Sequence, residues 1–371
     1  MSNAMKAIVN PKMLKWARET SGKSIESIAQ KMKKDIDCIE KWEIGDEKPT
    51  LRQAEKLAKY YKRPMAVFYL TKQPEESILP NNFRTLPYDV PHSFSSETLL
   101  VIRRAKRLQE IYIELLKETG KSISPIQIPR AKLTDSPELF ANNLRRQEKL
   151  SVSNQKDWKD EYQALKEWRK WFEDKGILVF MLSMPMEEGR GFLLTDNLVP
   201  AIILNTKDSV HGRIFSLFHE YAHLMLQQEF NRYQNNLSDI ELFCNSFAAS
   251  FLVPEESLKS QMSDNYELDI QVFNLSKSFK VSQEVVLRRM LHVKLIDYQL
   301  FNQKLQSLSA KSSVTGGRIS QPKKCIRDNG KPFVNLVLDA YRDQRITYSD
   351  VSDFLNVKLK HIGEIERLLY E

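Results

Sequence analysis

One pentapeptide constrains this chain more than any other feature: His219-Glu220-Tyr221-Ala222-His223, an H-E-x-x-H pattern. Residues i and i+4 lie on one face of an α-helix about a turn apart, so His219 and His223 can bind a single metal ion. Glu220 lies at the edge of that face, where its carboxylate can take a proton from a water at the metal without being a ligand itself. The pattern predicts a zinc hydrolase.

The surrounding segment predicts the helix that this chemistry needs. Residues 209–226 read SVHGRIFSLFHEYAHLML, in which apolar residues recur at helical spacing. Asp208 or Ser209 can cap its start, and neither proline nor glycine interrupts residues 213–230. We therefore expect a buried helix that carries the metal site.

A third protein ligand must come from elsewhere, because a catalytic zinc commonly has three protein ligands and one water. The next predicted helix, IELFCNSFAASFLVP, ends at Pro254 and offers Glu241 near its start. Ser238 and Glu241 also fit the pattern S-x-x-E, so Glu241 could instead close a capping box. Asp239 is the alternative ligand.

Several segments together carry a family resemblance. In order and at similar spacings, the chain contains GILVFMLSMP, GFLLTD, VPAIILN, RIFSLFHEYAHLML and IELFCNSFAASFLVP. These segments resemble the ImmA/IrrE family of bacterial metallopeptidases over residues 176–295. The resemblance implies a zincin-like domain with one Zn²⁺ per chain, or Mn²⁺ or Fe²⁺ in its place. It also implies roles for individual residues: the ligands are His219, His223 and Glu241, the general base is Glu220, and Asn245 belongs to the helix of Glu241.

The first 70 residues form a basic block. They contain 15 Lys and Arg against 9 Asp and Glu, a net charge of +6, whereas the remainder has 41 against 39, a net charge of +2. Their apolar spacing and capping residues predict five short helices. The expected ranges are 11–21, 24–32, 36–44, 51–61 and 66–70.

Within this block, SIESIA and IDCIEKWEIG, followed by Pro49-Thr50 and RPMAVF, resemble the helix-turn-helix of phage-repressor-like (XRE) regulators fused to an ImmA/IrrE peptidase. The second helix of such a motif enters the major groove of double-stranded DNA. The candidate DNA contacts are Lys33, Lys34, Ile36 and Lys41. Asp35 and Asp37 would bring carboxylates close to phosphates, so a protein-docking module or a merely solvated surface remains the alternative.

We expect a mainly α (α+β) chain with a small sheet from residues 177–182, 191–194 and 200–204. Four aromatic residues before the sheet are expected in the core: Trp158, Trp168, Trp171 and Phe172. The expected division is residues 1–4, a tag remnant; 5–70, the helix-turn-helix domain; 71–94, a linker; 95–175, a helical region; 176–254, the peptidase core; 255–310, a helical subdomain; 311–328, a flexible segment; and 329–371, a helical tail.

A sheet beside the metal helix can hold a peptide substrate. We expect residues 199–205 to form an edge strand that adds an extended peptide through main-chain hydrogen bonds, although an internal strand is nearly as well supported. Candidates for positioning the substrate are Asn205, His211 and Tyr221. The second donor to the oxyanion stays open among Tyr221, His211 and Arg213.

Composition narrows the class of protein further. No apolar run approaches the roughly 18 residues that span a bilayer, and no signal-peptide core is present, so no membrane association is expected. Cys38, Cys244 and Cys325 are too few and too scattered for a disulfide framework, which favours a reducing cytoplasm.

The predicted function is a cytoplasmic zinc endopeptidase that cleaves one specific protein. The family resemblance implies that this substrate is a helix-turn-helix repressor of a mobile element or a stress response. The alternative is a DNA-binding regulator, or a toxin–antitoxin component, whose metal site is structural or inactive. The oligomeric state stays open.

Overall fold

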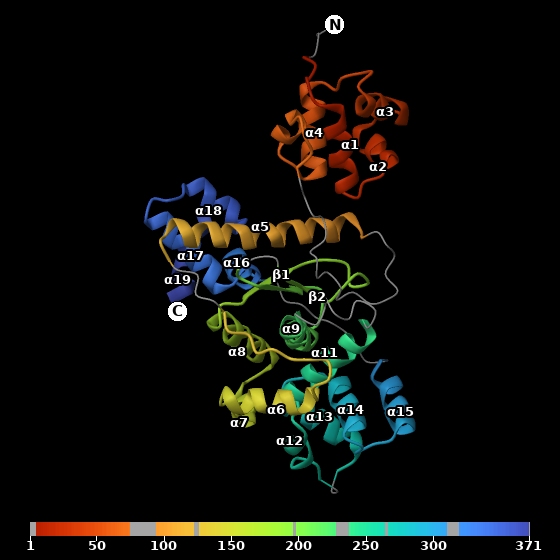
Figure 1. Ribbon diagram of the computed structural model, residues 1–371, viewed down its shortest axis with the longest axis vertical. Helices are drawn as coiled ribbons and strands as arrows, with labels where there is room; N and C mark the ends of the chain where they lie inside the picture. The colour runs from red at the N-terminus through yellow and green to blue at the C-terminus, as the bar shows by residue number, and fades with distance from the viewer. Residues whose placement is uncertain are drawn as a thin grey trace. The chain divides into compact units, whose positions relative to one another are not determined.

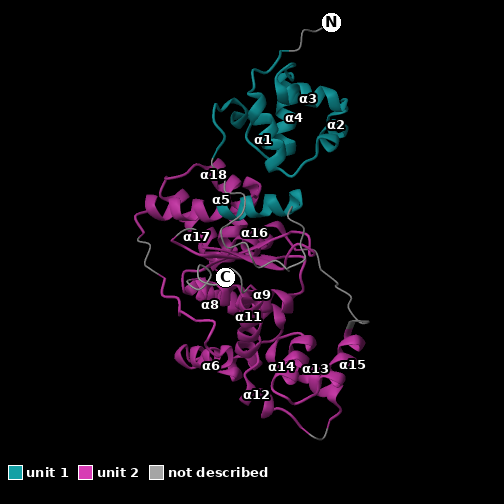
Figure 2. Cartoon of the chain, turned by 45° about the vertical axis from the view of Figure 1, so that its right-hand side comes forward, with its two compact units in different colours: residues 1–80, 88–106 teal, residues 81–87, 107–371 magenta. Residues whose placement is uncertain are grey.

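The computed structural model describes residues 5–74, 94–121, 126–195, 198–227, 237–263, 266–309 and 319–370. Most of the expected linker, and residues 311–318 of the expected flexible segment, therefore lie outside the described residues. As predicted, the chain is mainly helical with one small sheet (Figure 1). It divides into two compact units with a boundary between residues 106 and 107 (Figure 2).

The first unit contains the five short helices predicted for the basic block. Each observed boundary lies within one residue of its prediction: α1 Pro11–Thr20, α2 Ile25–Met32, α3 Ile36–Ile44, α4 Leu51–Tyr61 and the 3-10 helix η1 Met65–Tyr69. Capping explains this agreement, because Ser24 accepts a hydrogen bond from the Ser27 amide and Thr50 forms a capping box with Gln53.

A partly buried ion pair and a stacked arginine add to the hydrophobic core of the first unit. Arg18 of α1 binds both carboxylate oxygens of Glu43 of α3, at 2.8 and 2.9 Å. The guanidinium of Arg63 lies 4.3 Å from the centre of the Trp16 ring. The acidic residue in the W-E-x-G segment therefore has a structural role.

Helix α5, Ser96–Glu118, contributes to both units. In the first unit, the Ser96 hydroxyl donates to the carbonyl of Gly22 at 2.7 Å. In the second unit, the buried amide of Gln109 donates to the carbonyl of Val199, also at 2.7 Å.

The sheet consists of β1 Leu178–Leu182, β2 Gly191–Leu194 and β3 Ala201–Asn205 in the order β1-β3-β2. Strand β1 runs parallel to β3, and β2 runs antiparallel to it. The expectation that residues 199–205 form an edge strand is wrong, because β3 is hydrogen-bonded on both sides. Strands β1 and β2 form the two edges.

Both faces of the sheet are covered, so every residue of the three strands is buried. Helices α8, Glu161–Asp174, and α9, Val210–Met225, pack on one face, and α16, Gln321–Asn329, packs on the other (Figure 1). Phe333 of α17, Lys331–Arg342, meets Phe180 of β1 edge to face at 5.7 Å.

The C-terminal tail is part of this packing. Residues 321–328, expected to be flexible, instead form α16. Arg169 of α8 donates hydrogen bonds to the backbone carbonyls of Arg327 and Val179 and forms an ion pair with Glu173 at 2.7 Å. Because these contacts join α8, β1 and α16, they fix the start of the tail on the sheet.

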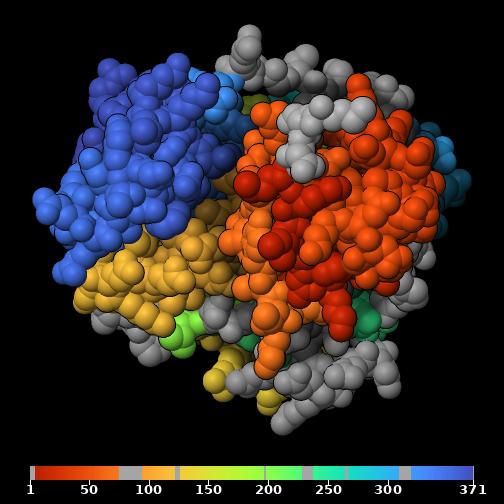
Figure 3. Space-filling view, turned by 90° about the horizontal axis from the view of Figure 1, so that it is seen from above, coloured from red at the N-terminus to blue at the C-terminus, as the bar shows by residue number. Residues whose placement is uncertain are grey.

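The tail continues through α18 Tyr348–Leu355, η2 Leu359–His361 and α19 Ile362–Tyr370. These helices form one surface with the second half of α5 (Figure 3). Helix α17 makes the contacts with this part of the chain: Lys121 binds Asp339 at 2.9 Å, and Tyr112 stacks on Phe333 with ring centres 6.4 Å apart.

The second unit also contains α6 Pro137–Gln147, α7 Val152–Asp157, α11 Leu237–Leu252, α12 Glu255–Lys259, α13 Leu268–Phe279, α14 Gln283–His292 and α15 Tyr298–Ser309. The hydrophobic core of this unit contains the aromatic residues that were predicted for it. Trp168 and Phe172 are buried in it, while Trp158 and Trp171 are partly buried against it. Phe218 of α9 stacks on Phe251 of α11 with ring centres 4.5 Å apart.

Within the described ranges, no helix combines the length and the apolar character needed to cross a membrane. The three cysteines are free, as expected.

Candidate metal centre

The start of α9 is fixed by hydrogen bonds of Ser209 and Asp208. Ser209 caps the helix by accepting a hydrogen bond from the Gly212 amide at 2.9 Å. Asp208 accepts the Ser209 amide at 2.7 Å and binds Arg190 at 3.0 Å. A Cβ on Gly212 would lie only 2.4–2.6 Å from the Asp208 carboxylate, so a larger residue there would force this carboxylate to move.

Two turns further along α9, two of its histidines meet a glutamate of α11. The Nε2 atoms of His219 and His223 lie 3.0 Å apart. Glu241 of α11 places Oε2 at 3.3 Å from His219 Nε2 and Oε1 at 3.2 Å from His223 Nε2. The three donor groups lie within 4.8 Å of one another. Two imidazole nitrogens and a carboxylate oxygen form a donor set that suits zinc.

Asn245 orients one of the candidate ligands. It lies one turn after Glu241 on α11, and its Oδ1 accepts a hydrogen bond from Nδ1 of His219 at 3.0 Å. This bond holds a proton on Nδ1 and turns Nε2 toward the other two donor groups. One helix therefore supplies both a candidate ligand and the group that orients another candidate ligand.

The geometry favours the ligand role of Glu241 over the capping role. Helix α11 begins at Leu237, so Ser238 lies inside its first turn and is not the cap. The carboxylate of Glu241 faces the two histidines, whereas Asp239 is exposed and is not part of the cluster.

The ionisation of Glu241 gives the cluster a negative charge that favours a cation. Burial raises the pKa of Glu241, but hydrogen bonds with His219 and His223 outweigh it and hold the pKa at about 2. Burial lowers the pKa of His223 and also acts to lower that of His219, whose pKa is nevertheless raised by its contacts with Glu241 and by the charge of Glu220. The carboxylate is thus ionised at neutral pH and available to a metal.

Glu220 lies beside this cluster and is only 2% exposed. Its Oε2 has no hydrogen-bond partner among the described residues. Burial raises the pKa of Glu220 to about 8. Gly191, the first residue of β2, lies against it, because a Cβ there would be 3.6 Å from Oε1. A buried carboxylate oxygen without a partner, next to three converging donors, fits a site that is completed by a cation and a water.

Three other predicted site residues lie elsewhere. The buried amide of Asn205 accepts from the Met184 and Lys207 amides and donates to the carbonyls of Met184 and Gly189, so it holds the β1–β2 loop rather than a substrate. Tyr221 lies in the aromatic core with its ring 5.0 Å from Phe172. Arg213 points toward Met181 of β1. Each of these side chains thus faces the sheet or the core, and the structure does not bring them to the cluster of His219, His223 and Glu241.

His211 does lie near the site. It is half-buried on the first turn of α9 and lines a pocket together with Phe215 and Asn245. Burial lowers the pKa of His211. Its expected role in positioning the substrate therefore remains a proposal.

The candidate DNA contacts lie on or beside α3. Ile36 is 42% exposed, and Lys33 and Lys34 are exposed before the helix. Lys41, however, is held by Asp37 of the same helix, with Nζ 2.7 Å from the carboxylate. This ion pair competes with a phosphate contact, and DNA binding stays a prediction.

Residues 172–291 match the family model of the IrrE N-terminal-like domain, Peptidase_M78. The match begins in α8, ends in α14 and contains the sheet, both ligand-bearing helices and Glu220. It supports a metallopeptidase-type domain in this part of the chain, in agreement with the resemblance seen in the sequence. The N-terminal helices and the C-terminal tail lie outside the match. No curated protein matches the chain.

Sequence reasoning missed Arg190, Gly191 and the pocket beside the metal centre. Gly191 and Gly212 were the available signals, since a glycine inside a strand or helix often marks a close approach of other atoms. The pocket had no local signal, because residues from several separate segments form it.

Proposed function

We propose that this chain is a zinc-dependent endopeptidase. The observation that carries the proposal is the convergence of His219, His223 and Glu241 beside the buried, unpartnered carboxylate of Glu220. The match to a peptidase family over residues 172–291 supports it.

The residues divide the chemistry between them. His219, His223 and Glu241 would hold the metal, with His219 oriented by Asn245. A zinc ion supplies Lewis acidity, which activates water and polarises a carbonyl. The raised pKa of Glu220 would fall beside a bound cation, which would favour its carboxylate form. Glu220 would then accept the proton that the attacking water loses and pass it to the amine that leaves when the peptide bond breaks.

We further propose that the substrate is a specific cytoplasmic repressor protein and that the N-terminal domain brings the peptidase to that protein or to double-stranded DNA. The helix-turn-helix resemblance and the net charge of +6 on residues 1–70 support this targeting role.

A DNA-binding regulator, or a toxin–antitoxin component, with a structural metal site is the second candidate. Structural zinc sites are closed by four protein ligands, whereas the described residues bring three donor groups together. A structural site also has no use for a buried carboxylate such as Glu220. Both observations favour the enzyme.

The deciding experiment compares wild type with Glu241→Ala and Glu220→Gln. Elemental analysis gives the metal content, and co-expression with a repressor encoded beside the gene gives the loss of that repressor. We expect about one zinc per chain in wild type and in Glu220→Gln, little in Glu241→Ala, and repressor loss with wild type alone. Asp239→Ala, which changes a nearby exposed carboxylate, is the matched control and should behave as wild type.

Two outcomes would contradict the proposal. Normal zinc content in Glu241→Ala would remove the ligand assignment. Repressor loss at the wild-type rate in Glu220→Gln would contradict the proposal of an enzyme and favour the DNA-binding regulator.

A further inference from the structure

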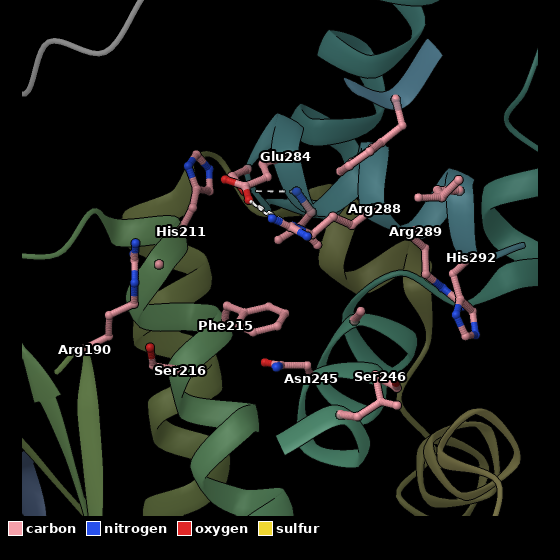
Figure 4. Close-up of a pocket in the computed structure, with 17 residues that line it drawn as sticks. Arg190, His211, Phe215, Ser216, Asn245, Ser246, Glu284, Arg288, Arg289 and His292 are labelled. Carbon is pink, nitrogen blue, oxygen red and sulfur yellow. Dashed lines mark hydrogen bonds and ion pairs between the residues drawn. The ribbon is translucent and has the colours of Figure 1, made fainter. Parts of the chain in front are cut away.

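A pocket lies beside the metal centre, between α9, α11 and α14. Its cavity volume is about 770 Å³, within the range of about 300–1,000 Å³ that is usual for ligand pockets. Figure 4 shows side chains of the three helices around this space. The pocket has room because α9 and α11 contribute small lining residues, namely Gly212, Ser216, Ser246 and Ala249. It can hold a short stretch of peptide.

The pocket adjoins the candidate metal ligands through two of its lining residues. Asn245 lines it and also holds His219 at 3.0 Å. Phe215, one turn before His219 on α9, lines it with a ring centre 6.4 Å from that of His219. A peptide whose carbonyl lies at the metal would therefore place a neighbouring side chain in the pocket.

Most of the accessible surface of the lining is apolar, although polar and charged side chains also contribute to it. Five large apolar residues contribute to it: Phe215, Leu242, Val285, Leu291 and Phe301. Most of them rest on the main hydrophobic core, so the pocket is an indentation in the core's outer surface. Leu242, next to the ligand Glu241, is instead 66% exposed. An apolar occupant would remove this exposed surface from water.

The exposed arginines of the lining do not favour an acidic ligand, because each already forms an ion pair with a carboxylate of the protein. Arg190 binds Asp208 at 3.0 Å, and Arg288 binds Glu284 at 2.7 Å (Figure 4). An acidic ligand would have to compete with these partners.

Arg289 is the remaining arginine of the lining and is only 1% exposed. It donates to the carbonyl of Val253 at 2.8 Å and forms an ion pair with Glu138 of α6. It therefore fixes α14 as a wall of the pocket.

We propose that this pocket is a specificity subsite that accepts a large apolar side chain, of the leucine or phenylalanine class, from a substrate residue next to the scissile bond. The inference rests on the proposed peptidase function. It adds the chemical class of residue that the enzyme selects.

The test uses the zinc-loaded full chain and four hydroxamates that differ in one side chain: methyl, isobutyl, benzyl and carboxymethyl. The hydroxamate group binds zinc in every compound, so differences in affinity report on the pocket. Calorimetry should show isobutyl and benzyl binding about ten-fold or more tighter than methyl, as expected for burial of several carbon atoms. The carboxymethyl compound should gain no such advantage.

Two variants change the pocket itself. Ala249→Phe fills it and should abolish the advantage of the benzyl over the methyl compound. Leu242→Ser removes an exposed apolar wall, so it keeps the test valid if Ala249→Phe does not fold, and it should reduce the same advantage. Gln303→Phe adds the same ring at an exposed position of α15, outside the pocket lining, and should leave the series unchanged.

The outcomes separate this inference from the function on which it rests. A chain that takes up no zinc overturns the proposed function and the inference together. Zinc uptake with equal affinities across the series, or with carboxymethyl binding tightest, overturns the inference alone. A normal preference for benzyl in both pocket variants also overturns it.

Discussion

Asn245 Oδ1 lies 3.0 Å from Nδ1 of His219, so the residue that orients one candidate ligand belongs to the helix that supplies another. The two-helix unit of α9 and α11 thus determines the tautomer of His219 as well as the position of Glu241. The metal centre is therefore sensitive to changes in α11 that leave all three donor groups in place.

Replacing Asn245 by alanine should weaken zinc binding without removing a ligand. Loss of an orienting hydrogen bond to a metal-bound histidine typically lowers affinity about 10- to 100-fold. Competition with a chromogenic chelator measures this change. Ser246→Ala, the adjacent position on α11, is the control and should bind zinc as wild type does. Equal affinities for Asn245→Ala and wild type would show that the hydrogen bond has no orienting role.

Zinc should stabilise the folded chain. A ligand present at about 100 times its dissociation constant adds about 2.7 kcal/mol to the free energy of unfolding, provided that it binds only the folded state. Thermal unfolding with and without chelator should therefore show a higher Tm with zinc. Glu241→Ala should lose this difference, while a persistent shift in that variant would point to a different zinc site.

Gly212→Ala should destabilise the protein by about 1–3 kcal/mol, because the new methyl group would overlap the Asp208 carboxylate. Gly363→Ala is the matched control, since a Cβ at that helical position meets no atom within 4 Å. It should cause no loss of stability. Urea unfolding of both variants measures the difference, and equal stabilities would mean that Asp208 can move aside at little cost.

Arg169→Met should destabilise the protein by about 3–5 kcal/mol, because it leaves the buried carboxylate of Glu173 without its partner. Lys170→Met removes the next ion pair on α8, between Lys170 and Asp174, which is exposed. It should change the stability little. Similar losses in the two variants would show that burial of the Arg169–Glu173 pair is unimportant.

The cost of Arg169→Met should also depend on pH. Burial raises the pKa of Glu173 above 4.5 even beside Arg169, and loss of Arg169 removes the effect that lowers it. A raised pKa in the folded state means that this state binds the proton more tightly than the unfolded state does. The cost should be full above the folded pKa and should shrink as the pH falls toward 4.5. Urea unfolding at several pH values measures it, and a constant cost would assign the loss to packing instead.

The sequence alone determined the local parts of this protein. The H-E-x-x-H helix, its capping by Ser209 and the five N-terminal helices follow from residue spacing and capping within a few neighbouring positions. The pairing of His219 with His223 is equally local, because helix geometry sets it.

Only the tertiary structure decided which distant segments meet. Nothing local to β3 shows that β1 and β2 pair on either side of it, and its apolar run fits an edge strand or a central strand equally well. The directions of the Asn205 and Tyr221 side chains were also decided by the tertiary structure, since nearness in sequence to the metal helix does not reveal which way a side chain faces. Arg169 helps to join the tail to the sheet, because it donates a hydrogen bond to the backbone carbonyl of Arg327, 158 residues away in the sequence. Contacts of this kind depend on how the whole chain buries its apolar surface, which no short stretch of sequence specifies.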